Sequence, residues 1–298
     1  MTDSTERDPG DIAERAAGGF ADVDGSGDPG YHIRYLDRVR SGGNWPRWKA
    51  ESVDAMELPV GGRGLDLGCG TGEEVEAIAR RVGTAGTAIG VDRSLVMLTE
   101  AARRQPDGTF LAADANALPF PAGAFAACRI ERTLQHLTDP ARCLRELARV
   151  LQPGGMLVAF EPDWDTLVTS SPLDDVTRAL NGFRRGENPS RRVGSQLTSL
   201  MVDAGLVVTA ARAVSVLITS YVVAEVGFSL EASCRRAVEA GAVSADEGAA
   251  WLASLRQLDA GGAFLASVTN VNAVARKPTG PRGPVTTRIA SLEHRPVG

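Results

Sequence analysis

The stretch from Gly64 to Gly72 constrains the fold of this chain more than any other. It reads GLDLGCGTG, an apolar run that ends in three glycines at alternate positions and opens directly into a helical pattern. A strand that turns into a helix through glycines lets a ligand approach the backbone closely, because no Cβ blocks the way. In open α/β sheets such a turn lies in a ligand crevice at the carboxyl end of a parallel strand. The stretch therefore predicts an α/β sheet that binds a nucleotide-like ligand.

Two details argue against a nicotinamide or flavin dinucleotide in this crevice. The dinucleotide fingerprint needs a third glycine three residues after the second, where this chain has Glu73. A pyrophosphate would also rest on the helix N-terminus, where Glu73 and Glu74 place two carboxylates that should repel it. The sequence therefore favours a cofactor that has no phosphate and a positive centre, such as the sulfonium nucleoside S-adenosylmethionine (SAM).

Strand and helix patterns alternate along the rest of the chain. The alternation predicts a mostly parallel, doubly wound sheet with helices on both faces. Strands are expected at 63–67, 88–91, 109–112, 125–130 and 156–160, within 206–221, and within 264–275. Helices are expected at 95–104, 140–151, 173–183, 195–204, 224–240 and 244–258, besides the one that follows the glycines.

Several motifs along the chain occur in the order typical of one enzyme family. The glycine stretch, Asp92, Asp114 and the turn at 153–155 follow one another at fitting distances. With these motifs the chain resembles the class I SAM-dependent methyltransferases, and in particular the small-molecule group of the ubiquinone/menaquinone type (methyltransferase type 11-like). The resemblance is close over 64–155. It implies a Rossmann-like fold of seven strands with the last antiparallel, a helical N-terminal lid and an insertion after strand five.

The resemblance also implies which residues bind the cofactor. Asp92, at the tip of the second strand, matches the acid that accepts from both ribose hydroxyls, which suits the two oxygens of a carboxylate. The alternative role of Asp92 as a helix N-cap can be filled by Ser94. Asp114 and Ala115 match the adenine-binding positions, although Asp114 could instead cap its own turn. The full set implied to bind SAM, or its product S-adenosylhomocysteine (SAH), is Asp66, Gly68, Cys69, Gly70, Gly72, Asp92, Arg93, Met97, Asp114, Ala115, Ile130 and Glu131.

Two residues after the fourth strand are candidate catalytic groups. His136 follows this strand, where methyl group and acceptor should meet, and its ordinary pKa of about 6.5 suits a general base. Local packing of His136 is the alternative. Glu131 is the second candidate. A base is needed only when the acceptor holds its proton near neutral pH.

The polarity of the acceptor site stays open from sequence alone. Arg132 could pair with a carboxylate of SAM or of the substrate, or with Glu131. Arg191 and Arg192, with two further arginines nearby, could clamp an acidic group, or could simply form a solvated face. An acidic and aromatic group at the end of strand five could instead hold a cationic acceptor. The candidate substrate-binding residues are Tyr31, Tyr35, Arg132, His136, Asp163, Trp164, Arg191 and Arg192.

Composition limits the classes of partner. The net charge of −5 and pI of about 5.4 give no basic field for nucleic acid, so a small-molecule acceptor is expected. The four cysteines have no paired short spacing, which favours reduced thiols and no metal site. We expect no secretory signal, no membrane span and a cytoplasmic protein. The aromatic N-terminal segment could pack on its own domain or on a partner subunit, so a homodimer stays open.

Composition also suggests boundaries within the chain. We expect a flexible segment at 1–28, a helical lid at 29–60 and the SAM-binding domain at 61–278. A substrate-roof insertion is expected at about 171–201, and a disordered tail at 279–298.

The sequence therefore predicts a SAM-dependent methyltransferase (EC 2.1.1.-) that acts on a small molecule, with specialised metabolism as its expected setting. Two alternatives remain. The first is a SAM-fold protein without methyl transfer, such as a cyclase, an isomerase or a binding module, because an acceptor pocket can change while cofactor motifs stay intact. The second is a dinucleotide oxidoreductase, which Glu73 disfavours.

Overall fold

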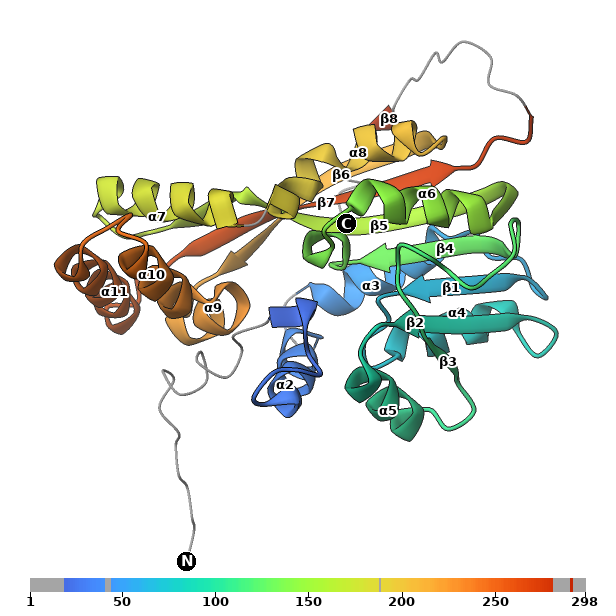
Figure 1. Cartoon of the computed structure of the whole chain (residues 1–298), viewed down its shortest axis with the longest axis horizontal. Coiled ribbons are helices and arrows are strands. Elements are labelled where there is room, and N and C mark those ends of the chain that lie inside the picture. The colour runs from blue at the N-terminus through green and yellow to red at the C-terminus, as the bar shows by residue number, and fades with distance from the viewer. Residues whose placement is uncertain (1–18, 41–43, 188, 281–289, 292–298) are drawn as a thin grey trace, which may run out of the picture. The chain divides into compact units, whose positions relative to one another are not determined.

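The computed structural model of the chain describes residues 19–40, 44–187, 189–280 and 290–291 (Figure 1). The chain divides into two compact units. The helical unit comprises Met1–Val39, Trp164–Pro189 and Ser215–Thr269. The sheet unit comprises Arg40–Asp163, Ser190–Val214 and Asn270–Gly298.

The strands form one sheet in the order β3-β2-β1-β4-β5-β7-β6-β8. Their bounds are β1 Arg63–Leu67, β2 Thr87–Asp92, β3 Thr109–Ala112, β4 Phe125–Glu131, β5 Leu151–Thr169, β6 Val207–Ile218, β7 Ala266–Arg276 and β8 Ala290–Ser291. β1 pairs in parallel with β2 and β4, β2 with β3, and β4 with β5. The carboxyl ends of β1, β2 and β4 therefore lie at one edge of the sheet, where the predicted cofactor residues follow them.

β7 runs antiparallel to β5. Near the start of β5, the Gly154 nitrogen donates to the Lys277 carbonyl at 2.8 Å, just beyond the end of β7. At the other end of the same pair, the Ser170 nitrogen donates to the Leu265 carbonyl at 2.9 Å, just before β7 begins. The start of one strand thus meets the end of the other. The predicted α/β fold, with seven strands in a mostly parallel, doubly wound sheet and one antiparallel strand, is confirmed.

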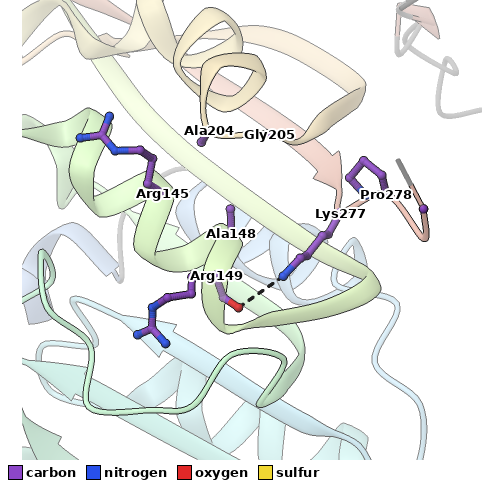
Figure 2. Close-up of a pocket in the computed structure, with 8 residues that line it drawn as sticks. Arg145, Ala148, Arg149, Ala204, Gly205, Lys277 and Pro278 are labelled. Carbon is purple, nitrogen blue, oxygen red and sulfur yellow. Dashed lines mark hydrogen bonds between the residues drawn. The ribbon is translucent and has the colours of Figure 1, made fainter. Parts of the chain in front are cut away.

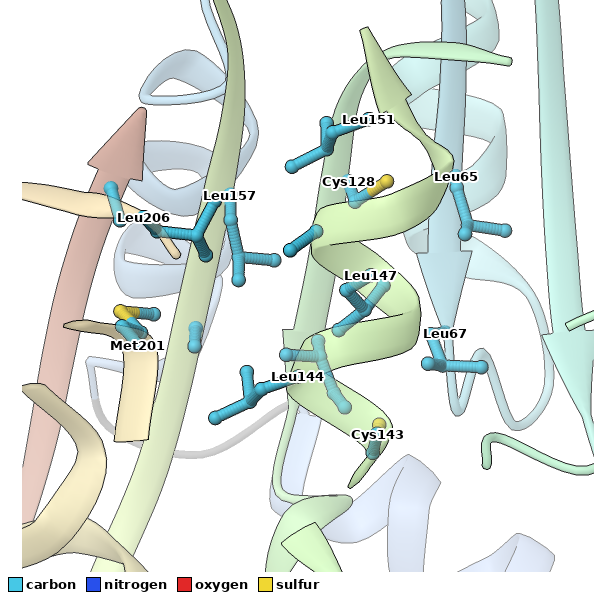
Figure 3. Packing of buried hydrophobic residues seen from close by; sticks show 14 of the residues in the cluster. Leu65, Leu67, Cys128, Cys143, Leu144, Leu147, Leu151, Leu157, Met201 and Leu206 are labelled. Atoms are coloured by element: carbon cyan, nitrogen blue, oxygen red, sulfur yellow. The ribbon is translucent and has the colours of Figure 1, made fainter. Parts of the chain in front are cut away.

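Helices α6 (Pro140–Val150) and α8 (Val193–Asp203) cover one face of the sheet. α6 begins as the sequence predicts, because the Asp139 side chain caps it by accepting from the Arg142 nitrogen at 2.8 Å and Pro140 follows. Burying each leucine of this layer contributes about 1.5–3 kcal/mol. Figure 3 shows Leu65, Leu67, Cys128, Leu144, Leu147, Leu157 and Met201 meeting in it.

Helices α3 (Trp45–Asp54), α4 (Glu73–Val82) and α5 (Leu95–Arg104) cover the opposite face of the sheet. Successive strand residues point to opposite faces, so Ala127 lies in this layer while Cys128 lies in the other. This layer also buries Val53, Met56, Val75, Ile78, Leu98, Met156 and Val158. α4 packs on β1 and β2, which holds its N-terminus at the end of β1.

The helical unit has its own apolar core. It is built from α7 (Asp174–Glu187), α9 (Tyr221–Phe228), α10 (Leu230–Glu239), α11 (Ala245–Ala260) and parts of β5, β6 and β7. Trp251 is buried at its centre, and its indole nitrogen donates to the Thr177 hydroxyl at 2.8 Å. α11 begins with a reciprocal capping box between Ser244 and Glu247. All of α2 (Pro29–Arg40) except Arg40 belongs to this unit.

The structure differs from the sequence prediction in four places. The helix expected at 224–240 is two helices, α9 and α10, because the backbone turns at Ser229 with a φ of 50°. β5 continues to Thr169, well beyond the predicted end at 160. α8 packs against α6 in the sheet unit, so only the first part of the expected insertion at 171–201 belongs to the helical unit. In the expected disordered tail, Ala290–Ser291 is a short strand that pairs in parallel with β6. Residues 1–18 of the first segment, and 281–289 and 292–298 of the tail, lie outside the described residues.

Three short 3-10 helices complete the described chain. They are η1 (Gly19–Ala21), η2 (Leu134–His136) and η3 (Pro189–Arg192). All four cysteines are buried with free thiols. No helix in the described ranges is long and apolar enough to cross a membrane.

Candidate active site

The glycine loop between β1 and α4 needs glycine at its positions. Gly68, Gly70 and Gly72 have φ values of 75°, 52° and 87°, in the left-handed region that side chains rarely adopt. A Cβ on Gly68 would overlap the Thr133 side chain, and one on Gly72 would lie 2.8 Å from the Phe110 ring. The loop is therefore packed from behind, and only its backbone can face a ligand.

Asp92 stands at the end of β2, beside the glycine loop. One carboxylate oxygen accepts from the Gly70 nitrogen at 3.0 Å, and the other from the Ser94 nitrogen at 2.9 Å. The Ser94 hydroxyl accepts from the Met97 nitrogen at 3.1 Å and so caps α5. The cap role therefore belongs to Ser94, and two backbone donors fix the orientation of the Asp92 carboxylate at the crevice edge.

Asp66 lies under the glycine loop and is 1% exposed. Its Oδ1 accepts from Nη1 of Arg129 at 2.8 Å, whereas its Oδ2 is buried without a hydrogen-bond partner. Burial raises the pKa of Asp66, although Arg129 counteracts this. An orphaned buried acceptor next to three left-handed glycines fits a ligand that brings an N–H donor or a positive centre to the loop. SAM has both features, so the residues present fit this cofactor.

Ion pairs surround the start of α4. Glu73 pairs with Arg40 and, at 2.7 Å, with Arg104. Glu74 is buried and pairs with Lys49 of α3 at 2.9 Å. Burial alone would raise the pKa of Glu74, but cations led by Lys49 outweigh it and lower the pKa to about 2. Cations thus balance both carboxylates, which removes the expected repulsion of a pyrophosphate. The case against a dinucleotide then depends on the missing third glycine.

Arg129 is the centre of a buried polar network that the sequence analysis missed. Its side chain is 3% exposed and contacts Asp66, the Ser52 hydroxyl at 2.8 Å and Glu131. Lys49 lies 3.4 Å from the second oxygen of Glu131. Two cations thus hold Glu131 as an ion-paired carboxylate, which argues against its predicted role as a general base. An arginine inside the apolar strand FAACRIE was the available signal.

The residues predicted to bind the adenine and its surroundings differ in exposure. Asp114 is exposed, and its Oδ1 accepts from the Asn116 nitrogen at 2.9 Å, so it does cap its own turn. Ala115 is buried beside it. Met97 and Ile130 are buried as well, with Ile130 in the apolar layer under α6, so only its backbone can meet a ligand.

The remaining predicted cofactor residues flank the loop itself. Cys69 is 5% exposed and packs in the layer under α4. Its backbone nitrogen donates to the Val91 carbonyl at 3.0 Å, which ties the loop to β2. Arg93 is exposed next to Asp92.

The segment after β4 is held by a buried carboxylate from β5. Glu161 is 0% exposed and accepts from the nitrogens of Thr133 and Leu134, both at 2.8 Å. Burial raises the pKa of Glu161 to about 8, although these backbone donors act in the opposite direction. His136 lies half-buried at the end of η2, in the segment that Glu161 fixes.

The predicted acceptor residues fall in both units. In the sheet unit, Asp163 is 5% exposed and accepts from the Ser195 nitrogen at 3.0 Å, so it caps the first turn of α8. Arg191 is half-buried and Arg192 exposed, both on η3. Two further arginines nearby in the sequence, Arg184 and Arg185, are on α7 in the helical unit, where Arg184 donates to the Ser233 hydroxyl at 2.6 Å.

The other three predicted acceptor residues belong to the helical unit. Tyr35 is 6% exposed, with its ring 5.3 Å from that of Phe20. Burial, with the nearby Tyr35 and Glu225, raises the pKa of Tyr31 to about 12. Trp164 packs edge-on against Phe228 at 5.7 Å. The structure therefore does not gather the predicted acceptor residues into one unit.

A pocket of about 430 Å³ opens elsewhere on the sheet unit (Figure 2). It is lined by Arg145, Ala148, Arg149, Ala204, Gly205, Lys277, Pro278 and Gly280. The Lys277 ammonium donates to the Leu151 carbonyl at 2.6 Å and to the Arg149 carbonyl at 3.3 Å, so it caps the end of α6. This pocket lies at the start of β5, whereas the glycine loop follows the end of β1, so it is separate from the crevice.

No group of three or more His, Cys, Asp or Glu side chains in the part of the chain that the structure describes is placed to hold a metal ion.

Known proteins resemble this chain in both sequence and fold. Residues 65–159 match the model of a methyltransferase domain. An uncharacterized 37.1 kDa protein in a transposon of Streptomyces fradiae is 36% identical over 250 residues, which cover 82% of this chain and 71% of that protein. The demethylmenaquinone methyltransferase of Paenarthrobacter aurescens is 38% identical over 173 residues, 56% of this chain and 63% of that enzyme.

A solved structure supports the same fold. The phosphoethanolamine N-methyltransferase 2 of Haemonchus contortus, in complex with phosphomonomethylethanolamine and SAH, superposes with a TM-score of 0.52 at 18% identity. The match covers 87% of this chain and 59% of that one.

With the glycine loop and the strand order, these matches define a class of protein: the chain belongs to the class I SAM-dependent methyltransferases. Its methyltransferase domain is similar to that of small-molecule enzymes of the ubiquinone/menaquinone type, and SAM is its cofactor. The chain spans 63% of the Paenarthrobacter enzyme and about half the length of other quinone methyltransferases that it matches.

Proposed function

We propose that this chain transfers a methyl group from SAM to a small-molecule acceptor. One observation carries the proposal: at the carboxyl ends of β1 and β2, a glycine loop in the left-handed region meets the oriented Asp92 carboxylate and the orphaned oxygen of Asp66. This combination suits a nucleoside that carries a positive centre.

The protein's share of the chemistry is binding and orientation. When bound, SAM supplies a methyl group that its sulfonium already activates, so the acceptor needs only to be held in line with it. Asp92 would accept from the ribose hydroxyls, and Asp66 would accept from the amino group. Asp114 and Ala115 would meet the adenine, and the glycine loop would let the cofactor approach the backbone.

The acceptor's proton decides whether a base takes part. Glu131 is paired with Arg129 and Lys49, so His136 is the remaining candidate from the sequence. An acceptor that is already ionised needs no base at all. His136 would then shape the site rather than move a proton.

The test is acceptor-dependent turnover with methyl-labelled SAM and a panel of small molecules that includes demethylmenaquinone, the substrate in the relatives' names. We expect SAH and labelled product to form in equal amounts. A purified protein that binds SAM, yet converts an acceptor to a product without the label, would instead support a SAM-fold cyclase, isomerase or binding module.

Four further expectations belong to the proposal. We propose a cytoplasmic protein that works in specialised metabolism, with neither nucleic acid nor membrane as partner. A homodimer remains a prediction that gel filtration with light scattering would check.

A further inference from the structure

Aromatic rings gather near the end of β4 and the middle of β5 in the sheet unit. The rings of Trp45 and Trp48, on one face of α3, meet edge-on with centroids 5.5 Å apart. Both rings contact Phe160 of β5, at 5.7 Å and 6.1 Å. The guanidinium of Arg132 lies over the Trp45 ring, 5.2 Å from its centroid. These four residues, Trp45, Trp48, Phe160 and Arg132, are called the aromatic wall below.

The aromatic wall lies beside the glycine loop. Arg132 directly follows β4, and its nitrogen donates to the Phe160 carbonyl at 2.8 Å, which joins the end of β4 to the middle of β5. The next residue, Thr133, packs so closely behind Gly68 that a Cβ there would overlap it. The wall therefore flanks the place where, on the function proposed above, the acceptor must meet the methyl group.

The backbone of Arg132 is strained in a way that fixes its side chain. Its φ of 51° lies in the left-handed region, which is unfavourable for a residue with a side chain. Strain of this kind persists where surrounding contacts determine it, often at ligand sites. Here the bond to Phe160 and the stack on Trp45 supply those contacts.

The wall has two chemical properties. Trp45 and Trp48 are each half-buried, so part of each ring remains open to a partner, whereas Phe160 is buried behind them. Flat rings favour offset or edge-on contact with another flat ring. A half-buried guanidinium beside them favours negative charge and repels a cation.

We propose that the aromatic wall binds a planar aromatic acceptor that carries a negative charge next to Arg132. This inference rests on the proposed methyl transfer and narrows its substrate class to aromatic carboxylates and related aryl anions. It also resolves the polarity that the sequence left open, in favour of an anionic acceptor.

Three probes of similar size separate the two properties. The full chain is saturated with SAH, and each probe is titrated by calorimetry and by quenching of tryptophan fluorescence. 2-Naphthoate is planar and anionic, 2-naphthamide is planar and neutral, and decahydro-2-naphthoate is anionic but not planar. We expect 2-naphthoate to bind about tenfold more tightly than either of the others, since a charge-assisted contact and a ring contact each contribute about 1–2 kcal/mol.

Variants assign the effect to the wall. Arg132→Gln should bring the affinities for naphthoate and naphthamide to within about threefold, because the charge preference is lost. Trp45→Leu should instead remove the preference for naphthoate over its decahydro form. Arg145→Gln is the matched control. This arginine is exposed on α6 beside Asp139, and its loss should change neither ratio.

Two results would overturn the proposal. One is a wild-type protein that binds SAH and either binds none of the probes or binds naphthamide as tightly as naphthoate. The other is an Arg132→Gln variant that keeps SAH affinity and the full charge preference. Failure to bind SAH at all would instead count against the proposed function, so the two failures are distinguishable. The wild-type ratios decide the class even where a variant does not fold.

Discussion

The two halves of the candidate site in the sheet unit are built from different groups. At the ends of β1 and β2, backbone groups make the surface: three left-handed glycines and a carboxylate that backbone donors orient. At the end of β4 and the middle of β5, long side chains make it, namely the rings of Trp45, Trp48 and Phe160 and the ion pairs of Arg129 and Lys49. A backbone site is fixed by a short local motif, whereas a side-chain site depends on partners far apart in the chain.

Removing a buried cation from the side-chain half should lower the free energy of unfolding more than removing an exposed one. We expect Arg129→Met to lower the free energy of unfolding by about 3–5 kcal/mol, because it leaves Asp66 and Glu131 buried without their cation. Urea unfolding followed by circular dichroism measures this loss. Arg81→Met removes an exposed pair with Asp54 and should cost only about 0–1 kcal/mol. Equal losses in the two variants would mean that the buried network contributes no more than a surface pair.

The backbone half should bind SAH more weakly when one of its glycines gains a side chain. Gly68→Ala introduces an overlap with Thr133 at a φ of 75°, so the loop has to move. Strain of about 1–3 kcal/mol should weaken SAH binding by as much as about 100-fold in calorimetry. Gly123→Ala is the control, because its φ is 72° but the nearest atom to the added Cβ is 3.8 Å away. If the Gly68 variant bound SAH as tightly as the wild type, the contact between Gly68 and Thr133 would not constrain the loop.

The segment that carries the acceptor side should respond to pH through Glu161. Its folded pKa of about 8 lies above the ordinary value of 4.5, so the folded state binds the proton more tightly than the unfolded state. Its contribution is complete below pH 4.5 and is lost as pH rises through 8. Between about pH 6 and 7, the unfolding free energy should fall by up to about 1.4 kcal/mol more in the wild type than in Glu161→Gln. Parallel pH profiles of the two proteins would show that Glu161 keeps an ordinary pKa.

A substitution in the helical unit should have the smallest effect on stability and should leave SAH binding unchanged. Ser244→Ala removes the capping box of α11 and should cost about 1 kcal/mol of unfolding free energy. SAH affinity should stay unchanged, since the cofactor residues belong to the sheet unit. Ser199→Ala, on the exposed side of α8, should be neutral in both measurements. A cofactor defect in the Ser244 variant would contradict the assignment of SAH binding to the sheet unit.

The same contrast explains what the sequence could predict. The first four strands were predicted to within one residue, because each is a short apolar run bounded by turn residues. The glycine loop and the cap of Ser94 were also predicted, since both depend on neighbours along the chain. The role of Asp92 at the ribose remains a prediction.

Long-range partners were not predictable from one sequence. Lys49 meets Glu74 and Glu131, which lie on different elements, and no local pattern joins them. The extension of β5 to Thr169 was hidden by Pro162 and two aspartates, which are poor strand formers.

The account depends most directly on the pairing of the glycine loop with Asp92 as a SAM site. Calorimetric titration with SAH, beside Asp92→Ala and the exposed control Asp107→Ala, tests it in one experiment. We expect micromolar binding in the wild type and in the control, and a loss of about 100-fold or more when the carboxylate is removed. Equal SAH affinity in all three proteins, or saturable NADH binding in place of SAH, would contradict it.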